Sequence, residues 1–202
     1  MDWDTNVQSY LALFAAGFPE ELRPKVCPLC KWDGFQQRHA NFIRSLQTLT
    51  ELFAVTIYRF FCKACKDTHS VFPSFFRPNH TIANEVQESV IAHLDSGESL
   101  KAAGEEICSG VTIDKKTVRR WEKFWTTTMV EQENFFVEQA LTLLPALVLP
   151  VGEARKAVAA SLFRWLSYIR RQITGVLGSF GLTCLFTLLV RLHFSLASAV
   201  VP

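Results

Sequence analysis

The chain carries at residues 52–65 the stretch LFAVTIYRFFCKAC. Residues 52–61 are rich in β-branched and aromatic side chains, which are favoured in β-strands. This run leads directly into Cys62 and Cys65, two cysteines that are separated by two residues. We therefore expect a strand that delivers Cys62 to a metal site.

A matching pair, Cys27 and Cys30, lies upstream with the same two-residue gap. Two such pairs are typical of a closed, tetrahedral zinc site of the structural kind. The predicted ligands of one Zn²⁺ are Cys27, Cys30, Cys62 and Cys65. The pairs of a zinc ribbon are usually about 15–20 residues apart, whereas here Lys31 through Phe61 intervene, so the linking hairpin must be long or carry an insertion. His69 could replace a cysteine as ligand, but four thiolates already fill a tetrahedral site.

Two disulfides or four buried free thiols are the alternatives to a metal. The chain has 202 residues, of which 49% are hydrophobic, so it can bury a core without covalent cross-links. Its amino-terminus, Met1-Asp2-Trp3-Asp4, is acidic where a secretory signal would be basic. We therefore expect a cytoplasmic protein whose paired cysteines bind metal. We expect Cys108 and Cys184 to be ordinary core residues.

The order of patterns along the chain predicts an α+β fold with four regions. These are an amino-terminal amphipathic helix in residues 1–24, a zinc ribbon in 25–78, a helix-turn-helix region in 79–131 and a helical carboxyl-terminal region in 132–202.

Within the ribbon, further short strands should accompany residues 52–61. A turn signal at Asp33-Gly34 is followed by a weaker strand pattern from Phe35 to Ile43, which would pair with residues 52–61. Residues 70–72, closed by Pro73, could supply a third strand. The ribbon is therefore expected to be a small antiparallel sheet.

From Arg77 onward the apolar period becomes that of helices. A first helix carries apolar residues every four positions from Ile82 to Leu94 and is ended by Asp95-Ser96-Gly97. A second, short helix begins after Ser99, and a third begins at Asp114, a good N-cap. Three helices of this order and length are typical of a helix-turn-helix unit, although the turn before the third is longer than usual.

The third helix concentrates the basic residues of this region. With Val118, Trp121 and Trp125 turned inward, the basic side chains lie largely on the other side. Such a face can enter a major groove, where cations neutralise phosphates and an arginine can pair with guanine. The alternative is a solvated helix face without a ligand. The predicted DNA-binding residues are Lys115, Lys116, Thr117, Arg119, Arg120 and Lys123, with Lys63 and Lys66 of the ribbon contacting the DNA backbone.

Three stretches carry a family resemblance: CPLC at residues 27–30, YRFFCKACKDTHSVFPSFFRP at 58–78 and TVRRW at 117–121. Over about residues 25–130 the chain resembles the amino-terminal DNA-binding part of insertion-sequence transposases and related uncharacterised bacterial mobile-element proteins. In such proteins the zinc ribbon and the helix-turn-helix recognise the terminal repeats of the element. The resemblance therefore implies double-stranded DNA as the partner, bound through both modules.

Transposases of this kind also have a downstream catalytic domain that holds two metal ions on three separated acids. This chain departs from that pattern, because after Glu138 only Glu153 is acidic. We therefore expect no enzyme activity, but an accessory or regulatory protein of a mobile element, acting as a homodimer or beside a separate transposase subunit. The alternative is a zinc-stabilised protein-interaction or membrane-associated regulator that does not bind DNA.

In the carboxyl-terminal region, an apolar stripe from Ala154 to Ile169 predicts one amphipathic helix with a basic side. That helix could contact DNA, a membrane surface or another subunit. Residues 172–190 carry no charge and are long enough to span a membrane. Because small and hydroxylic residues dilute their hydrophobicity, we favour a core or dimer helix. The basic side consists of Arg155, Lys156, Arg164, Arg170 and Arg171.

Overall fold

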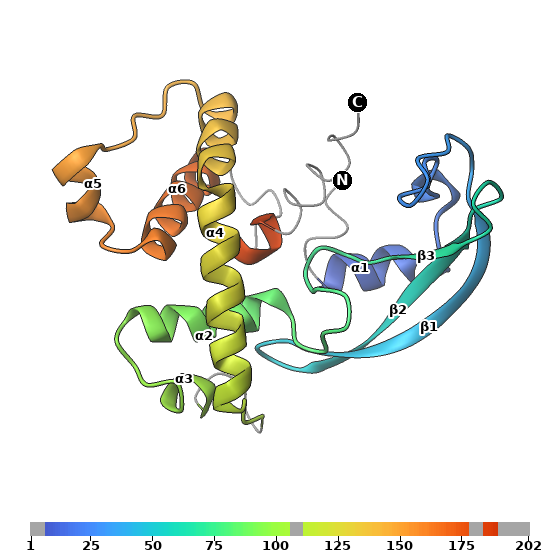
Figure 1. Ribbon diagram of the computed structural model, residues 1–202, viewed down its shortest axis with the longest axis horizontal. Coiled ribbons are helices and arrows are strands. Elements are labelled where there is room, and N and C mark those ends of the chain that lie inside the picture. Colours follow the sequence, from blue (N-terminus) through green and yellow to red (C-terminus); the bar gives the residue numbers. More distant parts are fainter. Residues whose placement is uncertain (1–6, 106–110, 178–183, 190–202) are drawn as a thin grey trace.

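The computed structural model describes residues 7–105, 111–177 and 184–189. Within these residues, an antiparallel sheet occupies one side of the molecule and a group of helices the other (Figure 1). The predicted α+β class is confirmed. The division into four regions stays a prediction.

In the described part of the chain, three strands form one sheet in the order β1-β2-β3. They are β1 (Gln37–Gln47), β2 (Leu52–Phe61) and β3 (Thr68–Val71). The long hairpin of β1 and β2, in which Gln37 pairs with Phe61 and Gln47 with Leu52, fills the wide gap between the two cysteine pairs. The strand predicted at residues 52–61 is confirmed, whereas its partner begins and ends later than the predicted 35–43.

Helix α1 (Val7–Phe14) covers one face of the sheet, followed by a single 3-10 turn, η1 (Glu20–Leu22). The Tyr10 hydroxyl donates a hydrogen bond of 2.6 Å to the carbonyl oxygen of Thr56 in β2. The rings of Phe18 and Phe60 meet edge to face with centroids 5.0 Å apart. This aromatic layer holds the amino-terminal helix on the hairpin that carries the cysteines.

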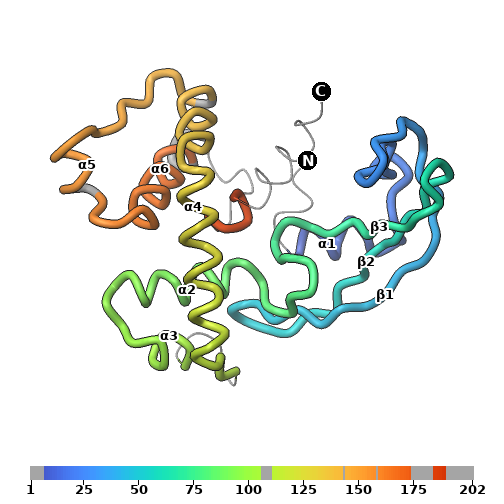
Figure 2. Tube along the Cα trace, viewed as in Figure 1, coloured from blue at the N-terminus to red at the C-terminus, as the bar shows by residue number. Residues whose placement is uncertain are grey.

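The helix-turn-helix unit consists of α2 (Asn84–Asp95), α3 (Ala102–Glu105) and α4 (Lys115–Leu143). As predicted, α2 ends before Gly97, which adopts a positive φ of 100°. Asp114 caps α4, since its carboxylate accepts a hydrogen bond from the N–H of Lys116 at 2.8 Å. Figure 2 shows that α4 extends from beside α3 to the carboxyl-terminal helices, well beyond the expected basic segment.

Among the described residues, helices α5 (Gly152–Val158) and α6 (Leu162–Leu177) follow α4. The single helix predicted from Ala154 to Ile169 is therefore wrong. Ala159 is extended, and the Ser161 hydroxyl accepts a hydrogen bond of 3.1 Å from the N–H of Arg164, which starts α6. Apolar residues keep the same helical spacing on both sides of this break, so the sequence pattern did not reveal two separate helices.

Segment 184–189 packs against the middle of α4 (Figure 1). The rings of Phe186 and Trp125 are stacked with centroids 3.8 Å apart, and Cys184 is buried in the core as expected. Cys108 lies outside the described residues, as does part of the apolar run 172–190. In the part of the chain that the structure describes, no helix combines the length and the hydrophobicity that crossing a bilayer requires.

Candidate metal centre and nucleic-acid interface

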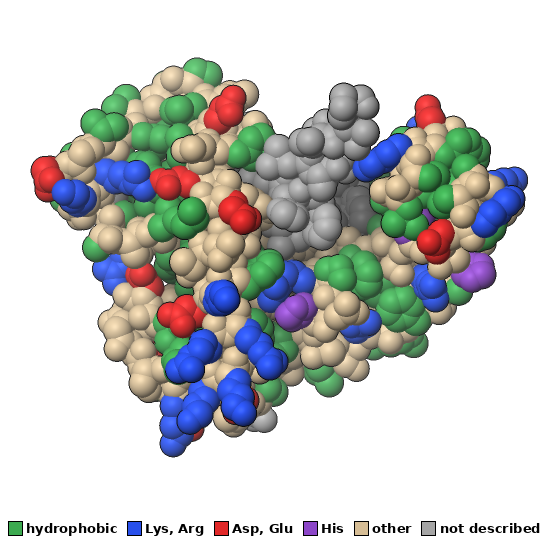
Figure 3. Space-filling view, in the orientation of Figure 1, with side chains coloured by type: hydrophobic (Ala, Val, Ile, Leu, Met, Phe, Trp, Pro, Cys, Tyr) green, Lys and Arg blue, Asp and Glu red, His purple; other side chains and the backbone are tan. Residues whose placement is uncertain are grey.

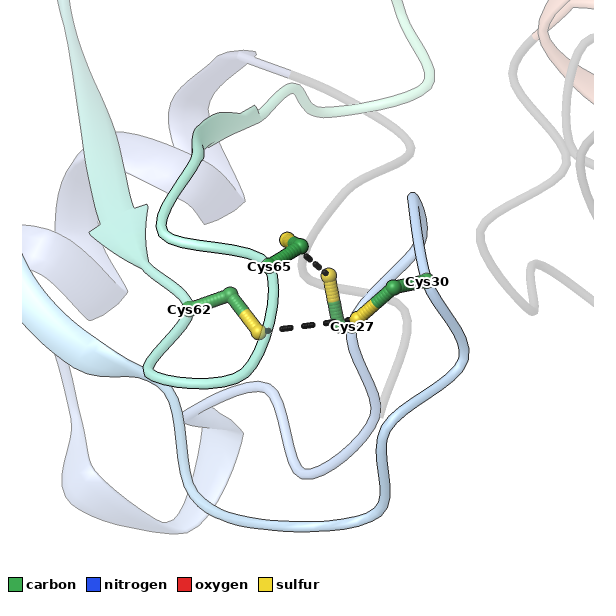
Figure 4. A group of neighbouring side chains, drawn as sticks. All are labelled: Cys27, Cys30, Cys62 and Cys65. Atoms are coloured by element: carbon green, nitrogen blue, oxygen red, sulfur yellow. Dashed lines mark hydrogen bonds between the residues drawn. The ribbon is translucent and has the colours of Figure 1, made fainter.

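The four predicted ligands lie together at the end of the β1–β2 hairpin that is remote from α4 (Figures 1 and 4). Each cysteine pair sits in a turn of the same construction. The N–H of Lys31 donates to the carbonyl of Cys27 at 2.9 Å, and the N–H of Lys66 donates to that of Cys62 at 3.0 Å. Both lysines have a left-handed backbone, with φ of 61° and 62°. Two matched turns therefore present their sulfurs to one another.

The sulfur atoms have the spacing that a tetrahedral metal requires. All four Sγ atoms lie within 4.8 Å of one another. The Cys27–Cys65 and Cys30–Cys62 sulfur pairs are 3.9 and 3.7 Å apart. Sulfurs placed tetrahedrally at about 2.3 Å from Zn²⁺ would be about 3.8 Å apart, whereas a disulfide needs about 2.05 Å. The geometry fits a metal ion, of which zinc is typical for four thiolates.

The electrostatics of the cluster also fit a cation. Burial opposes ionisation of Cys62, but the N–H groups of Cys65 and Ala64 and the adjacent thiols lower its pKa to about 7. The N–H of Asp67 favours the thiolate of Cys65, yet burial and the three other sulfurs raise its pKa to about 12. Four adjacent thiolates repel one another. A divalent ion removes this repulsion, and when bound it would link the two turns as a structural cross-link.

His69 is not part of this cluster, in line with the preference for four thiolates. Its ring lies 6.2 Å from that of Phe60, and among the described residues neither ring nitrogen has a hydrogen-bond partner. Burial lowers its pKa. His69 is therefore a neutral side chain that packs on the sheet.

The amino-terminal end of α4 is held in place by a close contact with α3. The N–H of Ile113 donates to the carbonyl of Gly104 at 3.1 Å. A Cβ atom at position 104 would lie only 2.4 Å from the carbonyl oxygen of Ile113. Glycine is required there because the segment just before α4 passes so close to α3. Val118, Trp121 and Trp125 are buried as predicted, which fixes the orientation of α4 about its axis.

The predicted basic face of α4 is on the surface. Figure 3 shows lysine and arginine side chains gathered over the amino-terminal part of this helix. Thr117 is half-buried. Within the described residues, none of the basic side chains of this face forms an ion pair with a carboxylate. The exposed members are Lys115, Lys116, Arg119, Arg120 and Lys123.

Unlike the exposed cations of α4, most of the basic side chains of α5 and α6 form ion pairs within the molecule. Arg155 pairs with Glu133 of α4 at 2.5 Å, and Lys156 pairs with Glu153 at 2.7 Å. In α6, two arginines pair with acids of α2. These pairs are Arg164 with Asp95 at 2.5 Å and Arg170 with Glu88 at 2.8 Å. The pairs of Arg155, Arg164 and Arg170 therefore join different helices to one another.

Lys63 and Lys66 are exposed on the second cysteine turn, and the structure does not bring them next to α4. Strand β2 has ten residues, so it spans about 30 Å at about 3.3 Å per residue. Its other end adjoins the start of the helix-turn-helix unit, where the N–H of Ala83 donates to the carbonyl of Gln47 at 2.9 Å. The two predicted groups of DNA contacts are therefore separated by roughly the length of β2.

Arg77 is not among the DNA-binding residues predicted from the sequence. In the structure its guanidinium lies 3.8 Å from the ring centroid of Phe124 in α4, beside Arg120. The basic character of residue 77 was visible in the sequence, but its neighbours were not. The basic surface that includes the exposed cations of α4 therefore extends beyond this helix to Arg77.

Residues 27–121 match a family model described as "Domain of unknown function (DUF6431)". The match begins at the first cysteine ligand and ends at Trp121, so it includes all four cysteines and the first turns of α4. The search of curated proteins and the search of solved structures each found no match to the chain.

Proposed function

We propose that this protein binds double-stranded DNA through α4 and depends on zinc for its folded ribbon. The observation that carries the proposal is the unneutralised basic face of α4. At about 100° per residue, the five exposed cations from Lys115 to Lys123 fall within an arc of about 140°, opposite the buried stripe. A helix with one buried side and one cationic side has the geometry of a major-groove reader.

The roles within α4 differ by side chain. Arg119 and Arg120 have the planar fork that pairs with guanine O6 and N7, whereas lysines act as point charges toward phosphates. Thr117, half-buried beside them, offers a hydroxyl. In this proposal, Lys115, Lys116 and Lys123 set the position of the helix on the backbone.

The ribbon adds a second contact. Lys63 and Lys66 lie roughly 30 Å from α4, by the length of β2. One turn of B-DNA is about 34–36 Å long. A duplex of two turns could therefore meet both groups, with α4 in a groove and the ribbon lysines on the backbone about one turn away.

The resemblance to the amino-terminal region of insertion-sequence transposases supports a finer proposal. In it, the chain is an accessory or regulatory protein of a mobile element that binds terminal repeats without catalysing strand transfer. It would act as a homodimer or beside a separate transposase subunit. The four-cysteine site, the helix-turn-helix that follows it in the chain and the scarcity of carboxylates after Glu138 support this proposal.

Selection from a random duplex library with zinc-loaded protein tests the proposal. Enrichment of a defined duplex, bound more tightly as salt is lowered, is the expected result. Absence of duplex binding even at low salt would overturn it. The mobile-element role is tested separately, by comparing affinity for the selected duplex with affinity for repeats that flank the coding sequence.

One observation favours a second candidate, a zinc-stabilised protein-interaction module. Several large apolar side chains in and around the first cysteine turn are exposed, and such clusters are typical of interaction surfaces. The fluorescence of Trp32 would then respond to a protein partner and not to DNA. The exposed residues are Val26, Leu29, Trp32 and Phe35.

A further inference from the structure

A groove lies between residues 77–82 and the amino-terminal half of α4, with a volume of about 390 Å³. Residues 77–82 join the sheet to α2 and are attached to β1, since the N–H of Gln47 donates to the carbonyl of Thr81 at 2.8 Å. The groove is therefore built from both halves of the molecule. Side chains that line it include Arg77, His80, Thr81, Thr117, Arg120 and Phe124.

The groove is cationic, and its described lining contains no carboxylate. Arg77 and His80 come from the connecting segment, and Arg120 comes from α4. Burial, and then the positive charges of Arg77 and of Arg44 in β1, lower the pKa of His80. Arginines from two separate parts of the chain, Arg77 and Arg120, thus line one hollow.

Among the described residues, an aromatic ring and a neutral amide hold Arg77 in this groove. Its guanidinium lies over the ring of Phe124, and its Nη2 donates to Oε1 of Gln87 at 2.8 Å. The same oxygen accepts a hydrogen bond of 2.9 Å from Nε1 of Trp125. The Arg77 Nε is buried and has no hydrogen-bond partner within the described residues, and the Nε of Arg44 is in the same condition.

A partly buried cation that is held by a neutral amide is energetically unfavourable unless an anion reaches it. Burial accordingly lowers the pKa of Arg77 to about 10. A tetrahedral oxyanion would supply the missing acceptors, and the hydroxyls of Thr81 and Thr117 in the lining can donate to it. The chemistry of the groove therefore favours a phosphate group.

We infer that this groove binds a backbone phosphate of the same DNA strand that α4 contacts, so that residues 77–82 belong to the DNA interface. This inference rests on the proposed function. Arg120 lines the groove and also lies on the exposed basic face, so one strand can pass from α4 into the groove without a break. Binding of this phosphate would then link the ribbon to the helix-turn-helix, because the groove is lined both by the segment that leaves the sheet and by α4.

The test uses the full-length, zinc-loaded protein and the duplex enriched from a random library of about 20 base pairs. Each backbone phosphate of that duplex is replaced in turn by a neutral methylphosphonate. For the wild type, replacement of the phosphate in the groove should weaken binding about tenfold, as for the loss of a hydrogen bond to a charged group. In Arg77→Gln, binding should already be about tenfold weaker, and replacement at that one position should have no further effect.

Lys156→Gln is the matched control, since it removes one exposed cation that is paired only with Glu153. It should leave the methylphosphonate profile unchanged. If Arg77→Gln fails to fold, His80→Gln carries the same test, because His80 also lines the groove. If the effect of methylphosphonate replacement at each position is identical in wild type and in all groove variants, the inference about the groove is wrong. The proposal that α4 binds DNA would still stand. Failure to enrich any duplex would overturn both.

Discussion

The Sγ atoms of Cys27 and Cys65 lie 3.9 Å apart, although 38 positions separate the two residues in the chain. Nothing but the fold of the long hairpin brings them together, and two thiols at this distance are spaced for a shared metal ion.

The first prediction is that purified protein contains one zinc per chain and that chelation unfolds residues 25–78. Structural zinc in small peptides contributes about 10–16 kcal/mol of apparent binding free energy at neutral pH. Cys62→Ser should therefore lose both the metal, measured by elemental analysis, and the tertiary signal in near-ultraviolet circular dichroism. Cys184→Ala, which removes a buried thiol outside the cluster, should keep one zinc per chain. Full retention of structure after chelation would contradict this prediction.

Gly104→Ala should destabilise the helix-turn-helix unit. The new Cβ would lie 2.4 Å from the Ile113 carbonyl oxygen, and overpacking of this kind costs about 1–3 kcal/mol. Gly97→Ala is the comparison, because Gly97 has a φ of 100° but open space around it, so only about 1–2 kcal/mol of backbone strain is expected there. Denaturant unfolding measures the loss of stability in both variants. An unchanged midpoint for Gly104→Ala would show that α3 and α4 are not packed this closely.

Lys116→Ala combined with Arg120→Ala should weaken DNA binding and its dependence on salt. If Arg120 reads a base edge, it contributes about 1–3 kcal/mol and its loss relaxes preference at one position. Loss of a phosphate contact flattens the slope of log affinity against log salt by about 0.9. The control is Lys156→Ala with Arg171→Ala, which removes two exposed cations from the carboxyl-terminal helices. Equal behaviour of the two double variants would exclude α4 as the recognition helix.

The separation of the ribbon from α4 predicts a dependence on duplex length. Lys63→Ala and Lys66→Ala should each flatten the salt slope by about 0.9 on a duplex of about 20 base pairs. On a duplex of about 8 base pairs, shorter than one turn, neither variant should differ from wild type, because the duplex cannot reach both groups. Fluorescence anisotropy with labelled duplexes measures this. An effect of Lys63→Ala on the short duplex would mean that the ribbon binds DNA at another place.

Phe186→Ala should destabilise the helical half of the protein by about 3–5 kcal/mol, the usual cost of truncating a buried phenylalanine. Phe186 is fully buried and stacked on Trp125 at 3.8 Å, so indole fluorescence should also change. Phe35→Ala, at an exposed site, should cost less than about 0.5 kcal/mol. If thermal unfolding shows equal losses, segment 184–189 does not pack on α4 as described.

The sequence by itself determined the features that depend on nearby residues. The cysteine spacing placed both metal turns, because two thiolates separated by two residues can reach one ion. Asp114 and Gly97 marked helix ends, because capping is decided within one turn. The apolar period of α4 predicted its buried stripe, and hence which side its cations occupy.

The tertiary structure alone decided which charges have partners. Arg164 and Arg170 look as basic in the sequence as Arg120, but acids 69 and 82 positions away neutralise them. Arg77, His80 and Arg120 line one groove only because the fold places the connecting segment beside α4. The physical reason is one of range along the chain. Backbone geometry and helix capping depend on a few neighbouring residues. The energy of a charge depends on all groups within several ångströms of it, and those groups come from any part of the chain.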